Sequence, residues 1–405
     1  MSDRAIGTWG TPRSSPVRLG RPRPGVRERA LADSSPLRRL DWVLLLAVAA
    51  MTTMGGLLVW SATRARQLEV GADPAAYLKR HILNAAIGLC VAAAAALVDY
   101  RALRAYAPVV YVASILGLLA VLVIGSTING AHSWIVLPGS FQLQPSEFAK
   151  VALVVGVAMI LAERRDGEAA PRDVDVVVVL LFTAVPLGLI MLQPDFGTTM
   201  VFVFCLLGMI AVSGAPVRWV AGLALAGVLA GTLILTTGVL KPYQRDRFTS
   251  FTQPGKALST TAYNVDQAKT AIGSGGIFGK GLFHGTQTNG QFVPEQQTDF
   301  VFTVAGEELG FVGAGALVAL LGVVLWRGLR IAQKAHDLFG TILAAGVVTW
   351  FAFQSFVNIG MTLGIMPVTG LPLPFVSYGG SSMFANLAAI GLLENVHMRT
   401  RSREP

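Results

Sequence analysis

Long apolar runs alternate with polar connections along most of this chain. A helix needs about 20 apolar residues to cross a bilayer, and ten runs of that order follow one another between residues 41 and 397. They predict helices at 41–61, 80–98, 105–125, 145–162, 174–192, 197–213, 218–239, 300–326, 338–361 and 378–397. The pattern therefore predicts an all-α integral membrane protein, a bundle of about ten transmembrane helices.

Composition agrees with lipid as the main solvent. Of the 405 residues, 53% are hydrophobic and 14% are charged, and the mean hydropathy is +0.59, whereas a soluble domain carries about 25% charged residues. The net charge of +9 would suggest nucleic acid as the partner of a soluble protein, but in a membrane protein Lys and Arg are first of all topology signals. We therefore expect no nucleic-acid partner.

The basic residues are divided unequally between the two sides of the predicted bundle. The side that holds both termini carries 21 of the 32 Lys and Arg residues, and the opposite side carries ten, six of them in segment 240–299. Cytoplasmic connections carry the excess of Lys and Arg. Both termini are therefore predicted to be cytoplasmic, and segment 240–299 to lie outside.

The two ends of the chain differ from its apolar centre. Residues 1–40 carry nine Arg with many Pro, Gly and Ser, and they lack the apolar stretch of a signal peptide. We expect a disordered cytoplasmic tail, with anionic membrane lipid as one candidate partner and a cytoskeletal or regulatory protein as the other. Residues 41–397 are predicted to form the membrane domain, and 398–405 a short cytoplasmic tail.

The long connections lie on the outer side, at 126–144, 240–299 and 366–381. Loops longer than about 15 residues are usually either functional or disordered. Segment 240–299 contains seven Tyr and Phe residues and a short helical pattern at about 261–272, which stops at Gly273. The sequence thus predicts a large ordered extracytoplasmic loop between the seventh and eighth helices, where function is expected.

Ionisable side chains within or at the edge of membrane helices are costly and are functional candidates. Glu147 and Lys150 are three residues apart and share a helix face; Lys150 and Asp195 lie near the outer ends of their helices and could pair. A structural ion pair that locks helices together is the alternative. The further candidates are Glu307 and Glu308 within the eighth helix, and Asp299 at its outer end, where a helix-capping acid is the alternative.

Asp299 and Glu307 do not form the two-carboxylate site of a glycosidase. Eight helical residues separate them by about 12 Å along the axis, which exceeds the roughly 5 to 9.5 Å that such sites use. A single outward carboxylate suits a reaction whose leaving group needs no general acid. A sugar diphosphate meets that requirement, because diphosphate is already a stable anion.

Basic residues in the same loop are candidates for binding a diphosphate. Arg245 and Arg247 flank one residue and suit bidentate phosphate contacts, and Lys280 lies between two glycines, for which turn formation is the alternative. The five His are isolated and no Cys/His cluster has metal-ligand spacing, so no protein metal site is predicted. Cys90 and Cys205 are interpreted as thiols of the apolar core.

Several short segments together resemble the shape, elongation, division and sporulation (SEDS) family, in family order over about residues 40–395. They are Asn129-Gly130-Ala131 with Trp134, Gln144-Pro145-Ser146-Glu147 with Lys150, Gln193-Pro194-Asp195-Phe196-Gly197-Thr198, Gly273-Ser274-Gly275-Gly276, Pro294-Glu295 through Thr298-Asp299-Phe300, Glu307-Glu308-Leu309-Gly310, Pro367-Val368-Thr369-Gly370 and Ser377-Tyr378-Gly379-Gly380-Ser381. Segments 240–245, 279–281 and 285–287 look more like those of its elongation members than of its division members. One departure is Gln297, where the family usually has His.

The resemblance implies ten membrane helices in a bacterial cytoplasmic (inner) membrane and a peptidoglycan glycosyltransferase that acts on lipid II. It also implies that Asp299 is the essential acid, and that a class B penicillin-binding protein is the transpeptidase partner. As a hypothesis, Asp299 acts as general base on the acceptor 4-hydroxyl in one inverting displacement that releases undecaprenyl diphosphate and forms a β-1,4 bond.

Other residues receive secondary roles in this hypothesis. Arg245, Arg247 and Lys280 are the candidates for binding the diphosphate, and Gln287 is a further candidate for substrate binding. Trp134 is either an interface anchor or part of a groove for the lipid chain. A divalent cation could assist the diphosphate, but no motif requires one. The alternatives are a lipid II flippase, a non-catalytic scaffold for the penicillin-binding protein, and the division-specific paralogue.

Overall fold

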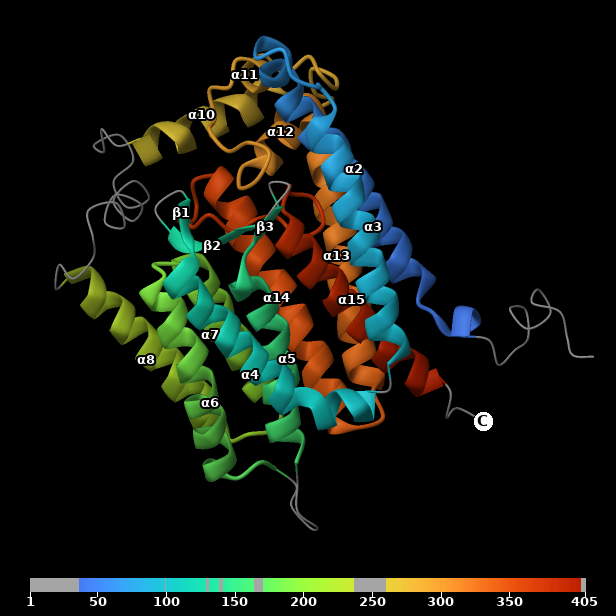
Figure 1. The fold of residues 1–405 in the computed structure, drawn as a ribbon, viewed down its shortest axis with the longest axis vertical. Coiled ribbons are helices and arrows are strands. Elements are labelled where there is room, and N and C mark those ends of the chain that lie inside the picture. Colours follow the sequence, from blue (N-terminus) through green and yellow to red (C-terminus); the bar gives the residue numbers. More distant parts are fainter. Residues whose placement is uncertain are drawn as a thin grey trace, which may run out of the picture. The chain divides into compact units, whose positions relative to one another are not determined.

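The structure, a computed structural model, describes residues 36–98, 100–128, 131–137, 141–163, 170–236 and 260–401. The chain divides into two compact units, residues 1–40 and 41–405. In the first, a short 3-10 helix η1 covers Pro36–Arg39. The second is a bundle of helices with one small sheet (Figure 1).

The helices of this bundle follow the apolar runs of the sequence. They are α2 (Trp42–Glu69), α3 (Ala76–Leu97), α4 (Tyr100–Ile124), α5 (Pro145–Ala162), α6 (Asp173–Leu192), α7 (Phe196–Val212), α8 (Val217–Thr236), α10 (Thr260–Ser274), α11 (Thr286–Asn289), α12 (Val301–Glu308), α13 (Gly310–Lys334), α14 (Leu338–Thr362) and α15 (Gly380–Arg401). The expected all-α membrane bundle is confirmed. By length and composition, seven helices of the described chain could cross a membrane, while α7 and α8 are shorter apolar helices; the number of ten spans stays a prediction.

Burial separates the central helices from those that face outward. In the most apolar window of α5 and of α14, 72% of the residues are buried, against 17% in α4 and 22% in α3. In Figure 1, α6 and α8 lie on one side of this centre, and α2 and α3 lie on the other. Charged side chains of α5 are therefore enclosed by protein rather than by lipid.

Small residues allow α3 and α15 to pack closely. A Cβ atom on Gly391 of α15 would lie 2.3 Å from the carbonyl oxygen of Ala92 in α3, and one on Gly88 would lie 2.5 Å from the side chain of Leu387. Lipid is as apolar as the side chains, so membrane helices gain little by burying apolar surface against one another. They associate instead through close van der Waals packing at small residues. The Ala- and Gly-rich sequence of α3 thus encodes a contact surface.

The helix predicted at 300–326 is not continuous, which corrects the prediction. It is divided into α12 and α13 at Leu309 and Gly310, and Gly310 has a φ of +67°. A Cβ atom on Gly310 would lie 2.2 Å from the backbone nitrogen of Gly279, so only glycine allows the loop to approach. Apolar periodicity continues across the break, and periodicity alone could not locate it.

The outer segments contain structure that the apolar pattern only partly predicts. The short helix expected at 261–272 is confirmed as α10. Segment 126–144, expected as a loop, contains strands β1 (Ser126–Ile128), β2 (Ala131–Leu137) and β3 (Phe141–Leu143), which pair antiparallel in that order. The run of β-branched residues beside the Asn129-Gly130 pair is the hairpin signal that could have predicted them.

Candidate functional site

Polar segments that are distant in sequence meet at the end of the bundle where α5, α7 and α15 begin. Gln144, just before α5, donates from its backbone nitrogen to Ser381 Oγ at 2.9 Å and from Nε2 to Asp195 Oδ2 at 3.1 Å. Ser381 Oγ in turn donates to the carbonyl oxygen of Gln142 in β3 at 3.2 Å. Three of the segments that carry the family resemblance are thereby joined by hydrogen bonds.

Asp299 lies at the same end, one residue before the N-cap of α12, and is half-buried. Its carbonyl oxygen accepts a hydrogen bond of 2.8 Å from Nδ2 of Asn358, and the same nitrogen donates to the carbonyl oxygen of Leu371 at 2.7 Å. Its carboxylate Oδ2 is 3.4 Å from the position that a Cβ atom on Gly370 would occupy. Gly370 is exposed, so the carboxylate lies against an open turn.

The neighbouring segment 291–297 borders a small polar cavity. Tyr378 donates its backbone N–H to the carbonyl oxygen of Gln297 at 2.9 Å, and the Tyr378 ring is 4.9 Å from that of Tyr77. The cavity has a volume of about 50 Å³, and its lining includes Arg66, Gln67, Tyr77, Gln291, Glu295, Gln296 and Gln297. Polar groups of α2 and α3 thus face the chain that leads to Asp299.

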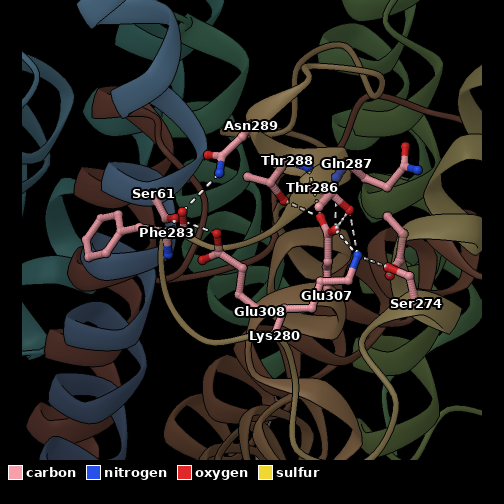
Figure 2. Close-up of polar contacts among 11 residues, drawn as sticks. Ser61, Ser274, Lys280, Phe283, Thr286, Gln287, Thr288, Asn289, Glu307 and Glu308 are labelled. Atoms are coloured by element: carbon pink, nitrogen blue, oxygen red, sulfur yellow. Dashed lines mark hydrogen bonds and ion pairs between the residues drawn. The ribbon is translucent and has the colours of Figure 1, made fainter.

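Glu307, near the end of α12, is fully buried and surrounded by hydrogen-bond donors (Figure 2). Its Oε2 accepts from the N–H and hydroxyl of Thr288 at 2.8 and 2.7 Å, and its Oε1 accepts from the N–H of Gln287 at 2.9 Å and from Lys280 Nζ at 2.8 Å. Burial by itself raises the pKa of this carboxyl, but the donors outweigh burial and hold the pKa below its usual value. Glu307 is therefore an ionised anchor for α11 and the preceding loop.

Lys280 is already bound to oxygen atoms of the protein. Besides Glu307, its ammonium donates to Ser274 Oγ and to Thr286 Oγ1, each at 2.7 Å. An ammonium has three N–H donors, and all three have acceptors here, while 26% of the side chain is exposed. Diphosphate binding by Lys280 stays a prediction, and it requires the lysine to exchange at least one of these partners.

Glu308 points in a different direction from its neighbour and connects α12 to α2 (Figure 2). Ser61 of α2 donates from Oγ to Glu308 Oε1 at 2.6 Å and accepts from the N–H of Phe283 at 3.1 Å. Burial raises the pKa of Glu308, and the hydrogen bond from Ser61 offsets only part of that effect. The two adjacent glutamates thus have pKa values displaced in opposite directions.

Glu147 and Lys150 form a salt bridge inside the bundle. Lys150 Nζ lies 2.8 Å from Glu147 Oε1, and both side chains are 2% exposed. The ammonium also donates to Gln354 Oε1 at 3.0 Å and lies 4.8 Å from the ring centroid of Trp350. The shared helix face predicted for this pair is confirmed, and the pairing of Lys150 with Asp195 is wrong.

Asp195 instead caps a helix. Its Oδ1 accepts from the N–H of Thr198 at 3.0 Å and its Oδ2 accepts from the Thr198 hydroxyl at 2.8 Å, in the position of the N-cap of α7. An acceptor here satisfies backbone donors that have no partner within the helix. With the bond from Gln144, this cap holds the start of α7 against the start of α5.

The remaining predicted site residues are spread more widely. Trp134 is half-buried in β2, where it pairs in register with Ser126, and Gln287 uses its backbone nitrogen to bind Glu307. Arg245 and Arg247 lie outside the residues that the structure describes. The substrate-binding roles of all four stay predictions.

Three buried amides were missed by the sequence reasoning: Gln296, Gln354 and Asn358, none of which is more than 4% exposed. Gln354 and Asn358 are four residues apart on one face of α14, and Gln354 donates to the carbonyl oxygen of Pro372 at 2.8 Å. For Gln354 and Asn358, an uncharged polar residue within an apolar run was the available signal, whereas Gln296 lies in the polar segment 294–299. Attention to ionisable groups alone passed over them.

The described part of the chain contains no group of three or more His, Cys, Asp or Glu side chains placed to hold a metal ion. Participation of a divalent cation stays a prediction.

Comparison with known proteins relates the whole bundle to one family. The family model of FtsW, RodA and SpoVE, described as cell cycle proteins, matches residues 41–402. A probable peptidoglycan glycosyltransferase FtsW from Trichlorobacter lovleyi is 36% identical, covering 89% of this chain and 93% of the relative. The peptidoglycan glycosyltransferase MrdB of Escherichia coli K12 is 37% identical, covering 88% and 93%.

Solved structures resemble the chain over a similar extent. A chain from a peptidoglycan synthase complex that coordinates polymerization and crosslinking has 34% identity and a TM-score of 0.75, covering 90% of this chain and 99% of its own. The crystal structure of the rod shape determining protein RodA from Thermus thermophilus has 34% identity and a TM-score of 0.66, covering 90% and 98%.

Proposed function

Because this chain belongs to the FtsW/RodA/SpoVE (SEDS) family and is a peptidoglycan glycosyltransferase, we propose that it polymerises lipid II into β-1,4-linked glycan strands with Asp299 as the general base. The observation that carries this proposal is the position of Asp299. It is a half-buried carboxylate beside the open turn at Gly370, at the end of the bundle where the motif segments meet.

In the proposed reaction, Asp299 accepts the proton of the acceptor 4-hydroxyl while that oxygen attacks C1 of the donor sugar. The new C1–O bond replaces the bond from C1 to the diphosphate, and undecaprenyl diphosphate leaves with both electrons of that bond. A single displacement inverts C1 and needs only one carboxylate. The tight engagement of Glu307 by five donors, including the Thr286 hydroxyl at 3.3 Å, supports this assignment, because Glu307 then has no free lone pair pointing at a substrate.

The diphosphate would be stabilised by basic side chains of the outer segments. Arg245 and Arg247 are proposed for this task, as guanidinium groups suit bidentate phosphate contacts. Lys280 is a weaker candidate than its sequence position suggests, since its three donors already have acceptors. Trp134 and Gln287 are proposed to contact the sugar or lipid parts of the substrate.

The protein is a multi-pass membrane protein. We place both termini in the cytoplasm and the α10–α12 segment outside, as the distribution of Lys and Arg supports. We assign it to cell elongation rather than division on the motifs at 279–281 and 285–287. Its partner would be a class B penicillin-binding protein, a proposal supported by the similarity to a chain of a peptidoglycan synthase complex.

The test is polymerisation of fluorescent lipid II by the purified protein, with and without a candidate penicillin-binding protein, resolved on a gel. Asp299→Asn should remain folded and bind the partner but make no glycan strands, because the amide cannot accept the proton. Detergent removes the distinction between leaflets, so polymerisation there also separates the enzyme from a flippase. Retained strand synthesis by Asp299→Asn would exclude Asp299 as the base.

A further inference from the structure

We propose that Asn358 is a positioning residue, whose single side-chain amide holds the segment of Asp299 and the turn at Gly370 in register with each other. The inference rests on the proposed role of Asp299 as general base. It concerns an uncharged residue of α14 that is fully buried. The positioning role is inferred from the hydrogen bonds of Asn358, which carries no charge.

The two hydrogens of the Asn358 amide reach carbonyl oxygens of two different segments. Nδ2 donates to Asp299 at 2.8 Å and to Leu371 at 2.7 Å. Leu371 directly follows Gly370, the residue that lies against the Asp299 carboxylate. One planar amide thus fixes both the residue that carries the carboxylate and the turn that borders it, on the buried side of each.

A second amide holds the same segment from its other side. Gln296 is 4% exposed and donates from Nε2 to the carbonyl oxygen of Ala62 in α2 at 3.0 Å and to that of Thr288 in α11 at 2.9 Å. The segment 296–299 is therefore attached to α14 through Asn358 and to α2 and α11 through Gln296. Asp299 lies closer to the Asn358 attachment, which is why that residue is assigned the positioning role.

A shift of the backbone at Asp299 or Leu371 would break a buried hydrogen bond and so cost free energy. Buried carbonyl groups need hydrogen-bond partners, so removal of the Asn358 amide would leave the Asp299 and Leu371 carbonyl groups to seek others. A general base must lie within hydrogen-bond reach of the proton that it accepts. A displacement of about 1 Å at a catalytic group can cost about 100-fold in rate.

The chain supplies a matched control in Asn395, another buried amide, on α15. Its Nδ2 donates to the carbonyl oxygens of Ala95 and Ala96 at 2.8 and 3.0 Å and also to that of Val98. These bonds join α15 to the end of α3 and involve none of the site segments. Asn358→Leu and Asn395→Leu therefore each remove a buried amide donor, at different places in the bundle; Asn395→Leu also removes the acceptor of a 2.9 Å hydrogen bond from Arg399 Nε.

The experiment measures kcat and KM for lipid II polymerisation, together with thermal stability, for both variants in detergent. We expect Asn358→Leu to lower kcat by about 100-fold with KM changed less than about twofold, because the residue contacts no substrate. Asn395→Leu should lose a comparable amount of thermal stability and keep kcat. Asn358→Ser retains one hydroxyl donor and should lose about tenfold in kcat, which covers the case in which the Leu variant does not fold.

Equal kcat values for Asn358→Leu and Asn395→Leu would overturn the inference, as would an effect on KM alone. If Asn358→Leu is active and Asp299→Asn is not, positioning by Asn358 fails while the proposed function stands. If Asp299→Asn is active, the proposed function itself fails. A large kcat loss confined to the Asn358 variants supports the assignment.

Discussion

Glu307 offers the sharpest test of how the outer segment is held to the bundle. Glu307→Gln keeps the size of the side chain but removes its charge and one of its two acceptor oxygens. The Thr288 donors that bind one oxygen in the wild type can be retained, while Lys280 and the Gln287 N–H would face an amide NH₂ group. The variant should therefore loosen segment 280–289 without unfolding the helices of the membrane domain.

The size of the effect follows from the bonds that are lost. Hydrogen bonds to charged groups contribute about 1.5 to 3 kcal/mol each, and two are removed. The bond from Lys280 is discounted, because that side chain is 26% exposed and regains water when released. A cost of about 3 kcal/mol remains, which corresponds to roughly 100-fold more frequent local opening.

Hydrogen–deuterium exchange read by mass spectrometry measures this opening directly, since the N–H groups of Gln287 and Thr288 bind Glu307 themselves. We expect exchange in the peptide that contains them to accelerate by about 100-fold in Glu307→Gln. Asp73→Asn is the matched control, because the Asp73–Lys79 pair is exposed and its bond is not part of this segment. That control should leave exchange in the peptide unchanged.

The pH dependence provides a second check on the sign of the effect. The pKa of Glu307 lies below its usual value, so its contribution to stability is present above the unfolded pKa and is lost as pH falls through the folded one. The difference in thermal stability between wild type and Glu307→Gln should therefore shrink below about pH 4.3. Unchanged exchange at neutral pH, or a difference that grows in acid, would refute the reasoning.

Two further predictions concern the same region. Burial raises the pKa of Glu308, so its stabilising contribution is present below the unfolded pKa and is lost as pH rises through the folded one. Glu308→Gln should therefore be more stable than wild type at pH 8 and equal to it at pH 4, as thermal unfolding would show. Gly275→Ala should lower the unfolding temperature, because its Cβ atom would lie 2.0 Å from the carbonyl oxygen of Gly306, whereas Gly273→Ala meets nothing within 4 Å and should be tolerated. Equal unfolding temperatures for the two alanine variants would contradict the close packing of this loop.

The membrane helices could be predicted from the sequence because the bilayer imposes a length and a polarity on each of them. Where water is excluded, the backbone N–H and C=O groups of an apolar run must bind each other, and a helix achieves this within one segment. The helices therefore coincide with the apolar runs. The Glu147–Lys150 pair could be predicted for a local reason as well, since residues three apart share one face of any helix. The Asp299 motif was recognisable because its residues are contiguous.

The failures concern choices between partners that are distant in sequence. Lys150 could have paired with Asp195. Its ammonium is bound instead by Glu147, buried on the same face of α5, and by Gln354 of α14. The break at Gly310 depends on how closely the loop at Gly279 approaches. Neither distance is encoded in a local pattern.

The sequence by itself determined which segments form the long apolar helices of the bundle, and it marked Asp299 as the acid most worth testing. Only the tertiary structure decided that the Glu307 carboxylate accepts hydrogen bonds from Lys280, Gln287 and Thr288, and that Asn358 binds the backbone at Asp299. The physical reason is that a helix follows from short-range periodicity and solvent exclusion. A hydrogen bond between segments requires both partners to be brought together by all the packing around them.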